Sequence, residues 1–182
     1  KNIDGSLWKF MRLHPPAFPT IRISQFANLI YKSLHLFSKI IEAPNIYTIR
    51  SLLSAEASEY WVSHYRFDKT SPQRKKLLGE DAKNLLIINT LVPFLFVYAK
   101  QKGESQLMER ALDFLDKTEA EKNSIIVKWS SFGVRSGNAS QTQALLQLKN
   151  EYCSRKRCLE CEVGAKLLHT ASSLPKGERE SA

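Results

Sequence analysis

Apolar residues in this chain recur at steps of three and four positions, the spacing of one helix face, rather than at every second position. The longest such pattern consists of Ile23, Phe26, Ala27, Ile30, Leu34, Phe37 and Ile41. It predicts one helix of about five turns whose apolar stripe faces the core. No alternating run is long enough to predict a strand. We therefore expect an all-α fold, a bundle of six or seven helices that ends in a C-terminal cysteine loop.

Helix-breaking and capping residues set the expected limits of two further helices. Asn45, which follows a proline, can cap the second helix. Residues 80–102 are predicted to form a strongly apolar helix that Gly103 ends and that Pro93 kinks. The apolar stretch 85–99 within it is shorter than the ~20 residues that span a bilayer. We therefore expect a buried core helix, and no membrane among the partners of the chain.

Two helix starts are predicted in the last third of the chain. Thr118 and Glu121 have the spacing of a capping box, and Asn138 can cap the helix that follows. This last long helix carries Tyr152 and leads directly into the cysteines. The expected organisation has three parts: an irregular N-terminal segment 1–20, a helical domain 21–171 and a flexible tail 172–182.

The three cysteines carry the most specific chemistry of the sequence. Cys153, Cys158 and Cys161 form the pattern Cys-x4-Cys-x2-Cys. Thiolates at this spacing can bind one zinc ion or an iron–sulfur cluster, so all three are candidate metal ligands. Their odd number, and a start without a secretory pattern, indicate a reducing compartment rather than a disulfide framework. We therefore expect a cytoplasmic protein.

The sequence offers no fourth cysteine to complete the metal site. A helical path from Cys161 to His169 would rise about 12 Å, too far for one metal ion. A fourth ligand must then come from a bend before His169, from His14 or His64, or from residues outside this chain. The alternative is three reduced thiols without a metal, packed as small apolar side chains. Redox or disulfide chemistry is a third interpretation.

The charge balance favours a polyanionic partner. Lysine and arginine total 27 against 18 acidic residues, which gives a formal net charge of +9. Such an excess suits DNA or RNA. The candidate phosphate contacts form two basic triplets, Arg74-Lys75-Lys76 and Arg155-Lys156-Arg157. Trp61 or Tyr65 can offer stacking faces if exposed. The alternative is that both triplets are solvated loops and that the aromatic residues fill the core.

No catalytic constellation converges in the sequence, so enzyme activity is left open. The acidic and amide side chains Glu119, Glu121 and Asn123 lie at a predicted helix start. Capping and interaction with the helix dipole explain them better than acid–base chemistry does.

Several stretches together resemble one bacterial family, the domain of unknown function 2851. They are Pro19-Thr20-Ile21-Arg22-Ile23 with Gln25-Phe26-Ala27, Tyr60-Trp61-x-x-His64-Tyr65, Asn89-x-x-x-Pro93, Glu121-x-Asn123-x-Ile125-x-x-x-Trp129, Gln143-Ala144-Leu145, and Tyr152-Cys-x4-Cys-Leu-x-Cys-x-Val-Gly. The resemblance implies that this chain is the C-terminal portion of a longer protein. It also implies an N-terminal region similar to PD-(D/E)xK nucleases, which would hold the catalytic carboxylates.

These observations combine into one functional expectation. We expect a helical module of a larger intracellular bacterial protein, a nucleic-acid-binding accessory domain beside a nuclease-like domain, with a thiolate site for a metal ion or cluster. The competing expectation is a purely structural or protein-interaction domain with free thiols and no nucleic-acid binding.

Overall fold

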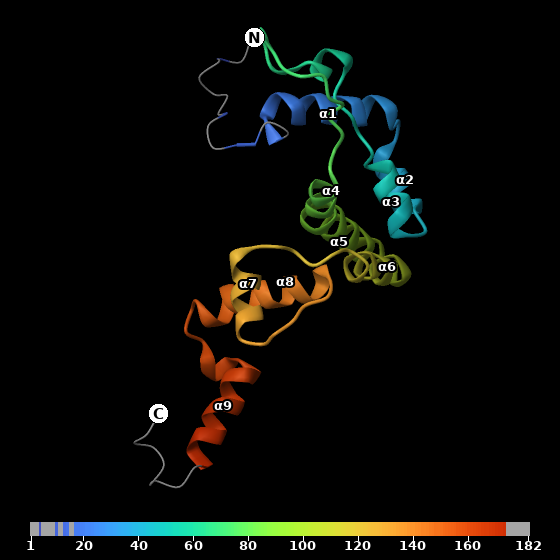
Figure 1. Cartoon of the computed structure of the whole chain (residues 1–182). Helices are drawn as coiled ribbons and strands as arrows, with labels where there is room; N and C mark the ends of the chain where they lie inside the picture. The colour runs from blue at the N-terminus through green and yellow to red at the C-terminus, as the bar shows by residue number, and fades with distance from the viewer. Residues whose placement is uncertain (1–3, 5–9, 11–12, 15–16, 174–182) are drawn as a thin grey trace. The chain divides into compact units, whose positions relative to one another are not determined.

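The computed structural model describes residues 4, 10, 13–14 and 17–173, and these residues are mostly helical (Figure 1). Its helices are α1 (Pro19–Lys32), α2 (Leu36–Glu42), α3 (Ile46–Leu52), α4 (Glu80–Leu86), α5 (Val92–Lys102), α6 (Ser105–Asp116), α7 (Ser124–Ser131), α8 (Ala139–Gln147) and α9 (Glu162–Ser173). The predicted all-α class is confirmed. Two very short strands, β1 (His64–Arg66) and β2 (Lys69–Thr70), form an antiparallel hairpin that the sequence did not predict.

The chain divides into two compact units, Lys1–Phe114 and Leu115–Ala182. The single helical domain predicted over 21–171 is therefore split near the end of α6. The predicted irregular segment 1–20 lies partly outside the described residues, and α1 already begins at Pro19. The predicted tail 172–182 lies outside them except for the last two residues of α9.

The long helix predicted over residues 23–41 is two helices, and its apolar stripe does not face the core. The backbone breaks between α1 and α2, where His35 adopts a left-handed conformation with φ 61°. The predicted stripe is largely exposed, with Phe26 at 63% and Leu34 at 72%. The buried residues of α1 are instead Thr20, Ile21, Gln25 and Leu29.

Two buried polar side chains explain why α1 presents this other face to the core. The amide Nε2 of Gln25 donates to the carbonyl of Lys76 at 3.0 Å. The hydroxyl of Thr20 donates to the carbonyl of Tyr65 at 2.7 Å. Tyr65 lies in β1 and Lys76 in the loop that follows β2, and both belong to residues 57–76, the hairpin segment. These bonds therefore turn the face that carries Ile21 inward.

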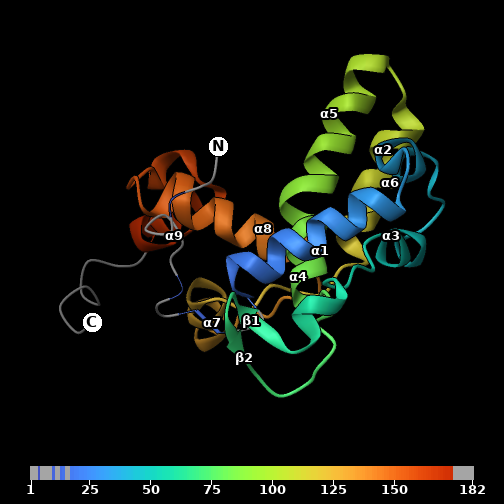
Figure 2. The ribbon, with the colours of Figure 1, turned by 90° about the horizontal axis from the view of Figure 1, so that it is seen from above.

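The hairpin segment completes a small aromatic core at the N-terminal end of α1 (Figure 2). Its buried members are Phe18, Ile21, Ala57 and Trp61. Tyr65 packs against this cluster from β1, with its ring centroid 6.2 Å from that of Phe18. The hairpin is therefore anchored on one side to a buried cluster of the first unit.

The predicted apolar helix over 80–102 is present, and a π-helical segment accommodates its proline. Ile87–Leu91 is π-helical and lies between α4 and α5, immediately before Pro93. A proline cannot donate the normal helical hydrogen bond, and the wider turn before it adjusts the backbone. Gly103 ends the helix as predicted, with φ 73°. Among the described residues this helix is long and apolar enough to cross a membrane, a test that soluble core helices also pass.

Asparagine caps were predicted well, whereas the capping box was not. The side chains of Asn45 and Asn138 accept from Thr48 N and Gln141 N at 2.9 and 3.0 Å. The helix predicted to open at Thr118 begins later, as α7, because Asn123 accepts from two backbone amides there. Thr118 is buried instead, and its carbonyl accepts from the Ala139 amide.

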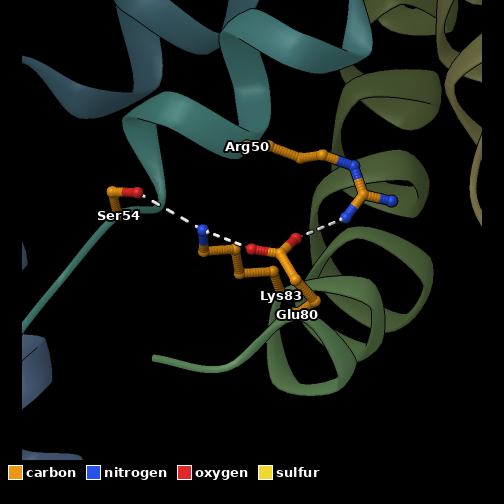
Figure 3. A network of polar contacts seen from close by, with 4 residues as sticks. All are labelled: Arg50, Ser54, Glu80 and Lys83. Atoms are coloured by element: carbon orange, nitrogen blue, oxygen red, sulfur yellow. Dashed lines mark hydrogen bonds and ion pairs between the residues drawn. The ribbon is translucent and has the colours of Figure 1, made fainter. Parts of the chain in front are cut away.

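An ionic network joins α3 to the start of α4 (Figure 3). The carboxylate of Glu80 lies between the Arg50 guanidinium, at 2.8 Å, and the Lys83 amino group, at 2.9 Å. Lys83 Nζ also donates to the Ser54 hydroxyl at 3.3 Å. The hydrogen bond from Lys83 is the main cause that lowers the pKa of Glu80 below its ordinary value of 4.5, and Arg50 adds to it.

Replacing Glu80 by glutamine should lower the free energy of unfolding by less than about 1 kcal/mol at neutral pH, because the carboxylate is 63% exposed. A lowered folded-state pKa contributes stability above the pKa of the unfolded chain, and this stability disappears as the pH falls through the folded-state value. Thermal melts of wild type and Glu80→Gln should therefore differ at neutral pH and converge well below pH 4.5. Glu109→Gln, at an exposed position of α6, is the control. A difference that persists in acid would contradict the ionic explanation.

Candidate functional site

The three cysteines lie where α8 gives way to α9, in the second unit. Helix α8 continues as a π-helical segment, Leu148–Cys153, so Cys153 ends this long helix as predicted. Cys158 opens a short 3-10 turn, and Cys161 directly precedes α9. Backbone amides close the loop between them, from Lys156 to the Cys153 carbonyl at 3.2 Å and from Cys161 to the Cys158 carbonyl at 3.3 Å.

Gly164 holds α9 against this loop. A Cβ atom built at Gly164 would overlap the backbone carbonyl of Cys158, so only glycine permits this approach. The Ala165 amide donates to the Cys161 carbonyl at 2.8 Å and fixes the same turn. The position of the second cysteine relative to α9 therefore depends on a residue without a side chain.

All three cysteines line a single pocket of about 170 Å³. Its other lining residues are mainly apolar: Trp129, Leu148, Tyr152, Val163, Gly164 and Leu167. Cys153 and Cys158 are exposed, whereas Cys161 is half-buried, and all three are free thiols. Cys153 also borders a more open pocket of about 420 Å³ that includes Lys128 and Lys149. The sulfur-bearing side chains thus share one small, mostly apolar cavity that is reachable from solvent.

The shared pocket is not by itself a metal-binding geometry. Within the described ranges, no three histidine, cysteine, aspartate or glutamate side chains are arranged to hold a metal ion. The donor set still suits a soft ion, since thiolate sulfur is the ligand that zinc and iron–sulfur clusters prefer.

None of the histidines suggested by the sequence completes this donor set as it stands. His169 lies exposed on α9 and is not among the residues that line the pocket. His64 belongs to the other unit, where its Nδ1 lies 2.9 Å from the Tyr60 carbonyl and 3.1 Å from the Ser63 hydroxyl. His14, in that same unit, is exposed.

The triplet beside the cysteines is partly neutralised. Arg155 pairs with Glu151 at 2.9 Å, and Arg157 pairs with Glu160. The hydrogen bond that Arg157 donates to the Glu160 carboxylate is the main cause that raises the pKa of Arg157. Lys156 is exposed in a left-handed backbone conformation, with φ 54°. Two of the three predicted phosphate contacts therefore already have carboxylate partners.

The residues of the other triplet, Arg74-Lys75-Lys76, differ in burial. Arg74 and Lys75 are exposed, and the Arg74 amide donates to the Val62 carbonyl at 2.9 Å. Lys76 is buried, and its amino group donates to the same carbonyl at 2.6 Å. Burial is the main cause that lowers the pKa of Lys76, and the charge of Arg74 adds to it. Lys76 is thus a structural residue, and its assignment as a phosphate contact is corrected.

Trp61 and Tyr65 belong to the core of the first unit, as the alternative interpretation of the sequence expected. Trp61 is buried, and the ring of Tyr65 lies beneath the amino group of Lys76, 4.2 Å from its centroid. The exposed rings of this segment are Tyr60 and Phe67. In the sequence, Phe67 ends an aromatic-rich stretch that includes Tyr60. Asp68, which follows it, takes the left-handed conformation of the hairpin turn.

The acidic cluster near α7 has structural partners. Asn123 caps the helix through its side chain, and a carboxylate oxygen of Glu121 accepts from the amide of Gln143. The capping interpretation from the sequence therefore holds for Asn123, whereas Glu121 contacts a side chain of α8.

Comparison with known proteins identifies the family of the chain and leaves its function open. No curated protein and no solved structure matches the chain. The family described as "Protein of unknown function (DUF2851)" has a model that matches residues 1–124. This range includes the hairpin, Arg74 and Lys75, and it ends before the three cysteines. Because the match covers more than half of the sequence, the chain belongs to the DUF2851 family, the family whose motifs its sequence resembles.

Proposed function

We propose that this helical DUF2851 chain is a nucleic-acid-binding module that also carries a thiolate site. The observation that supports the binding half is a run of exposed basic side chains around the hairpin, Lys69, Arg74 and Lys75. Two backbone hydrogen bonds fix the loop after β2 to the residues just before β1. Ser71 N donates to Ser63 O at 2.7 Å, and Arg74 N donates to Val62 O at 2.9 Å.

Electrostatics favours phosphate as the partner of this loop. The net charge of +9 raises the local concentration of a polyanion around the chain. Exposed lysine and arginine side chains that replace condensed counterions gain affinity in a salt-dependent manner. In the proposed setting, the module positions nucleic acid for a nuclease-like region of the same protein, in the cytoplasm of a bacterial cell.

For the thiolate site we propose a zinc ion or an iron–sulfur cluster bound by Cys153, Cys158 and Cys161. Their common pocket and the glycine-dependent approach of Cys158 to α9 support this assignment. The bound group would stabilise the junction of α8 and α9 by linking residues from both sides of it. A fourth ligand would come from outside the residues that line the pocket.

A second candidate function is a protein-interaction domain, and the surface of α1 favours it. Side chains of the predicted core stripe, such as Ile23, Phe26, Ile30 and Leu34, are exposed together on α1 and just beyond it. Contiguous apolar surface of this kind marks protein contacts. Under this second candidate, the nuclease-like region would cover α1, and the basic loop would only confer solubility.

Removing two basic side chains should weaken nucleic-acid binding if the first proposal holds. Replacing Arg74 and Lys75 together by alanine removes two exposed charges and leaves the buried Lys76 in place. The affinity should fall, and the slope of log affinity against log salt concentration should become less steep by about one unit for each phosphate that the variant no longer neutralises. Fluorescence anisotropy with a labelled oligonucleotide, repeated over a salt series, measures both changes.

The matched control for this double variant is Lys100→Ala with Lys102→Ala, two lysines in the last turn of α5. This pair removes the same charge from another element of the same unit. An equal loss in both double variants would indicate a non-specific effect of net charge. Indifference of wild type to DNA and RNA at low salt would refute the binding proposal.

Metal analysis tests the thiolate site separately. We expect about one zinc ion per chain, or iron with sulfide, in protein purified anaerobically, and protection of all three thiols from alkylation. Cys158→Ser and Gly164→Ala should each lose the metal, the second because its Cβ displaces the Cys158 backbone. Leu159→Ala, at an exposed position of the same loop that has no donor atom and does not line the pocket, is the control. Three reactive thiols and no bound metal would favour the free-thiol alternative.

A further inference from the structure

The tip of the hairpin exposes an aromatic ring between basic residues. Phe67 is 65% exposed and precedes Asp68, whose φ of 57° makes the turn between the two strands. Arg66 and Lys69 flank the turn on the two strands. A single exposed phenylalanine is common on protein surfaces, so only the residues around Phe67 can indicate a binding role for it.

Phe67 belongs to a set of aromatic rings that pack on one another and on a buried residue of the core. The rings of Tyr60 and His64 stack 4.2 Å apart at an interplanar angle of 7°. Phe67 lies 6.2 Å from Tyr60 and 5.2 Å from Trp61, measured between ring centroids. Trp61 is buried in the core cluster and provides the base on which these rings rest.

The ring positions are further held by hydrogen bonds of the hairpin segment. His64 Nδ1 lies within hydrogen-bond distance of the Tyr60 carbonyl, so the stacked pair is fixed through its own backbone. Tyr60 remains 43% exposed above this contact. Rings that are already ordered lose little conformational entropy when a ligand stacks on them.

The charges around these rings are mainly positive. Exposed basic side chains of this segment are Arg66, Lys69, Arg74 and Lys75, and its acidic residues are Glu59 and Asp68. The Arg66 guanidinium lies over the rings of Phe10 and Phe18, at 4.5 and 5.2 Å, and supports the base of the hairpin. Lys69, Arg74 and Lys75 are exposed cations, and the Arg74 amide bonds to the carbonyl of Val62, two residues after Tyr60.

From this combination we infer that the hairpin binds single-stranded nucleic acid. Unpaired bases stack on Tyr60 and Phe67, and the phosphates between them contact Lys69, Arg74 and Lys75. A base offers its flat face only when it is not stacked within a duplex, so this surface discriminates by strandedness rather than by sequence. The inference rests on the proposed nucleic-acid-binding function and specifies its partner.

The test compares a single strand of about 12 nucleotides with a duplex of the same sequence, each bound to the full chain. The single strand should bind more tightly. Phe67→Ala should weaken its binding about 5- to 150-fold, the range found when one stacked base loses its aromatic partner. Phe67→Trp should restore it, because any aromatic ring can support stacking. The salt dependence should not change in either variant, because neither removes a phosphate contact.

The matched control is Phe94→Ala, which removes an equally exposed phenylalanine, 66%, from α5 of the same unit. Circular dichroism and a thermal melt establish that each variant is folded. If Phe67→Ala does not fold, the comparison of single strand with duplex on the wild-type chain still tests the inference. Equal binding of single strand and duplex, with no effect of Phe67→Ala, would overturn this inference. The proposed function would still stand if that binding required Arg74 and Lys75. Failure of both nucleic acids to bind would overturn both.

Discussion

The side chain of Gln25 makes the hydrogen bond on which the first unit most depends. It is buried and reaches the carbonyl of Lys76, 51 residues further along the chain. A buried amide without a partner would cost about 1–3 kcal/mol, so this bond selects the face of α1 that points inward. Lys76 in turn donates to the Val62 carbonyl and lies over the ring of Tyr65. Helix, loop and hairpin are therefore ordered by one connected set of polar contacts.

Local signals were sufficient where local hydrogen bonds decide the structure. Asn45 and Asn138 cap helices because their side chains reach amides three residues away, and Gly103 ends a helix because it tolerates a positive φ. The orientation of α1 was not predictable in this manner. Periodicity identifies an apolar face, but only the distant Lys76 and Tyr65 carbonyls explain why the other face is buried. The role of Lys76 was missed for the same reason.

The candidate sites show the same division between local and distant information. The spacing of Cys153, Cys158 and Cys161 pointed to a common location, and all three residues border one pocket, although their side chains are not arranged to hold a metal ion. The sequence could not show that Gly164 must contact the Cys158 carbonyl, because that contact depends on the path of the loop. Phe67 ends an aromatic-rich stretch of the sequence, but the sequence does not show which rings of that stretch are exposed. Only the hairpin brings it next to Tyr60.

The π-helical segment Ile87–Leu91 has a consequence for the length of the helix around it. The buried residues Asn84, Ile88, Val92, Leu95 and Ala99 are spaced slightly wider than an ordinary helical repeat. These residues share a single face, and the widened turn accommodates one extra residue between α4 and α5. Deleting one residue there would turn the widened turn into a regular one and leave the residues beyond it on the face that they occupy now. The chain can therefore lose one residue before Pro93 without changing which side chains of α5 reach the core.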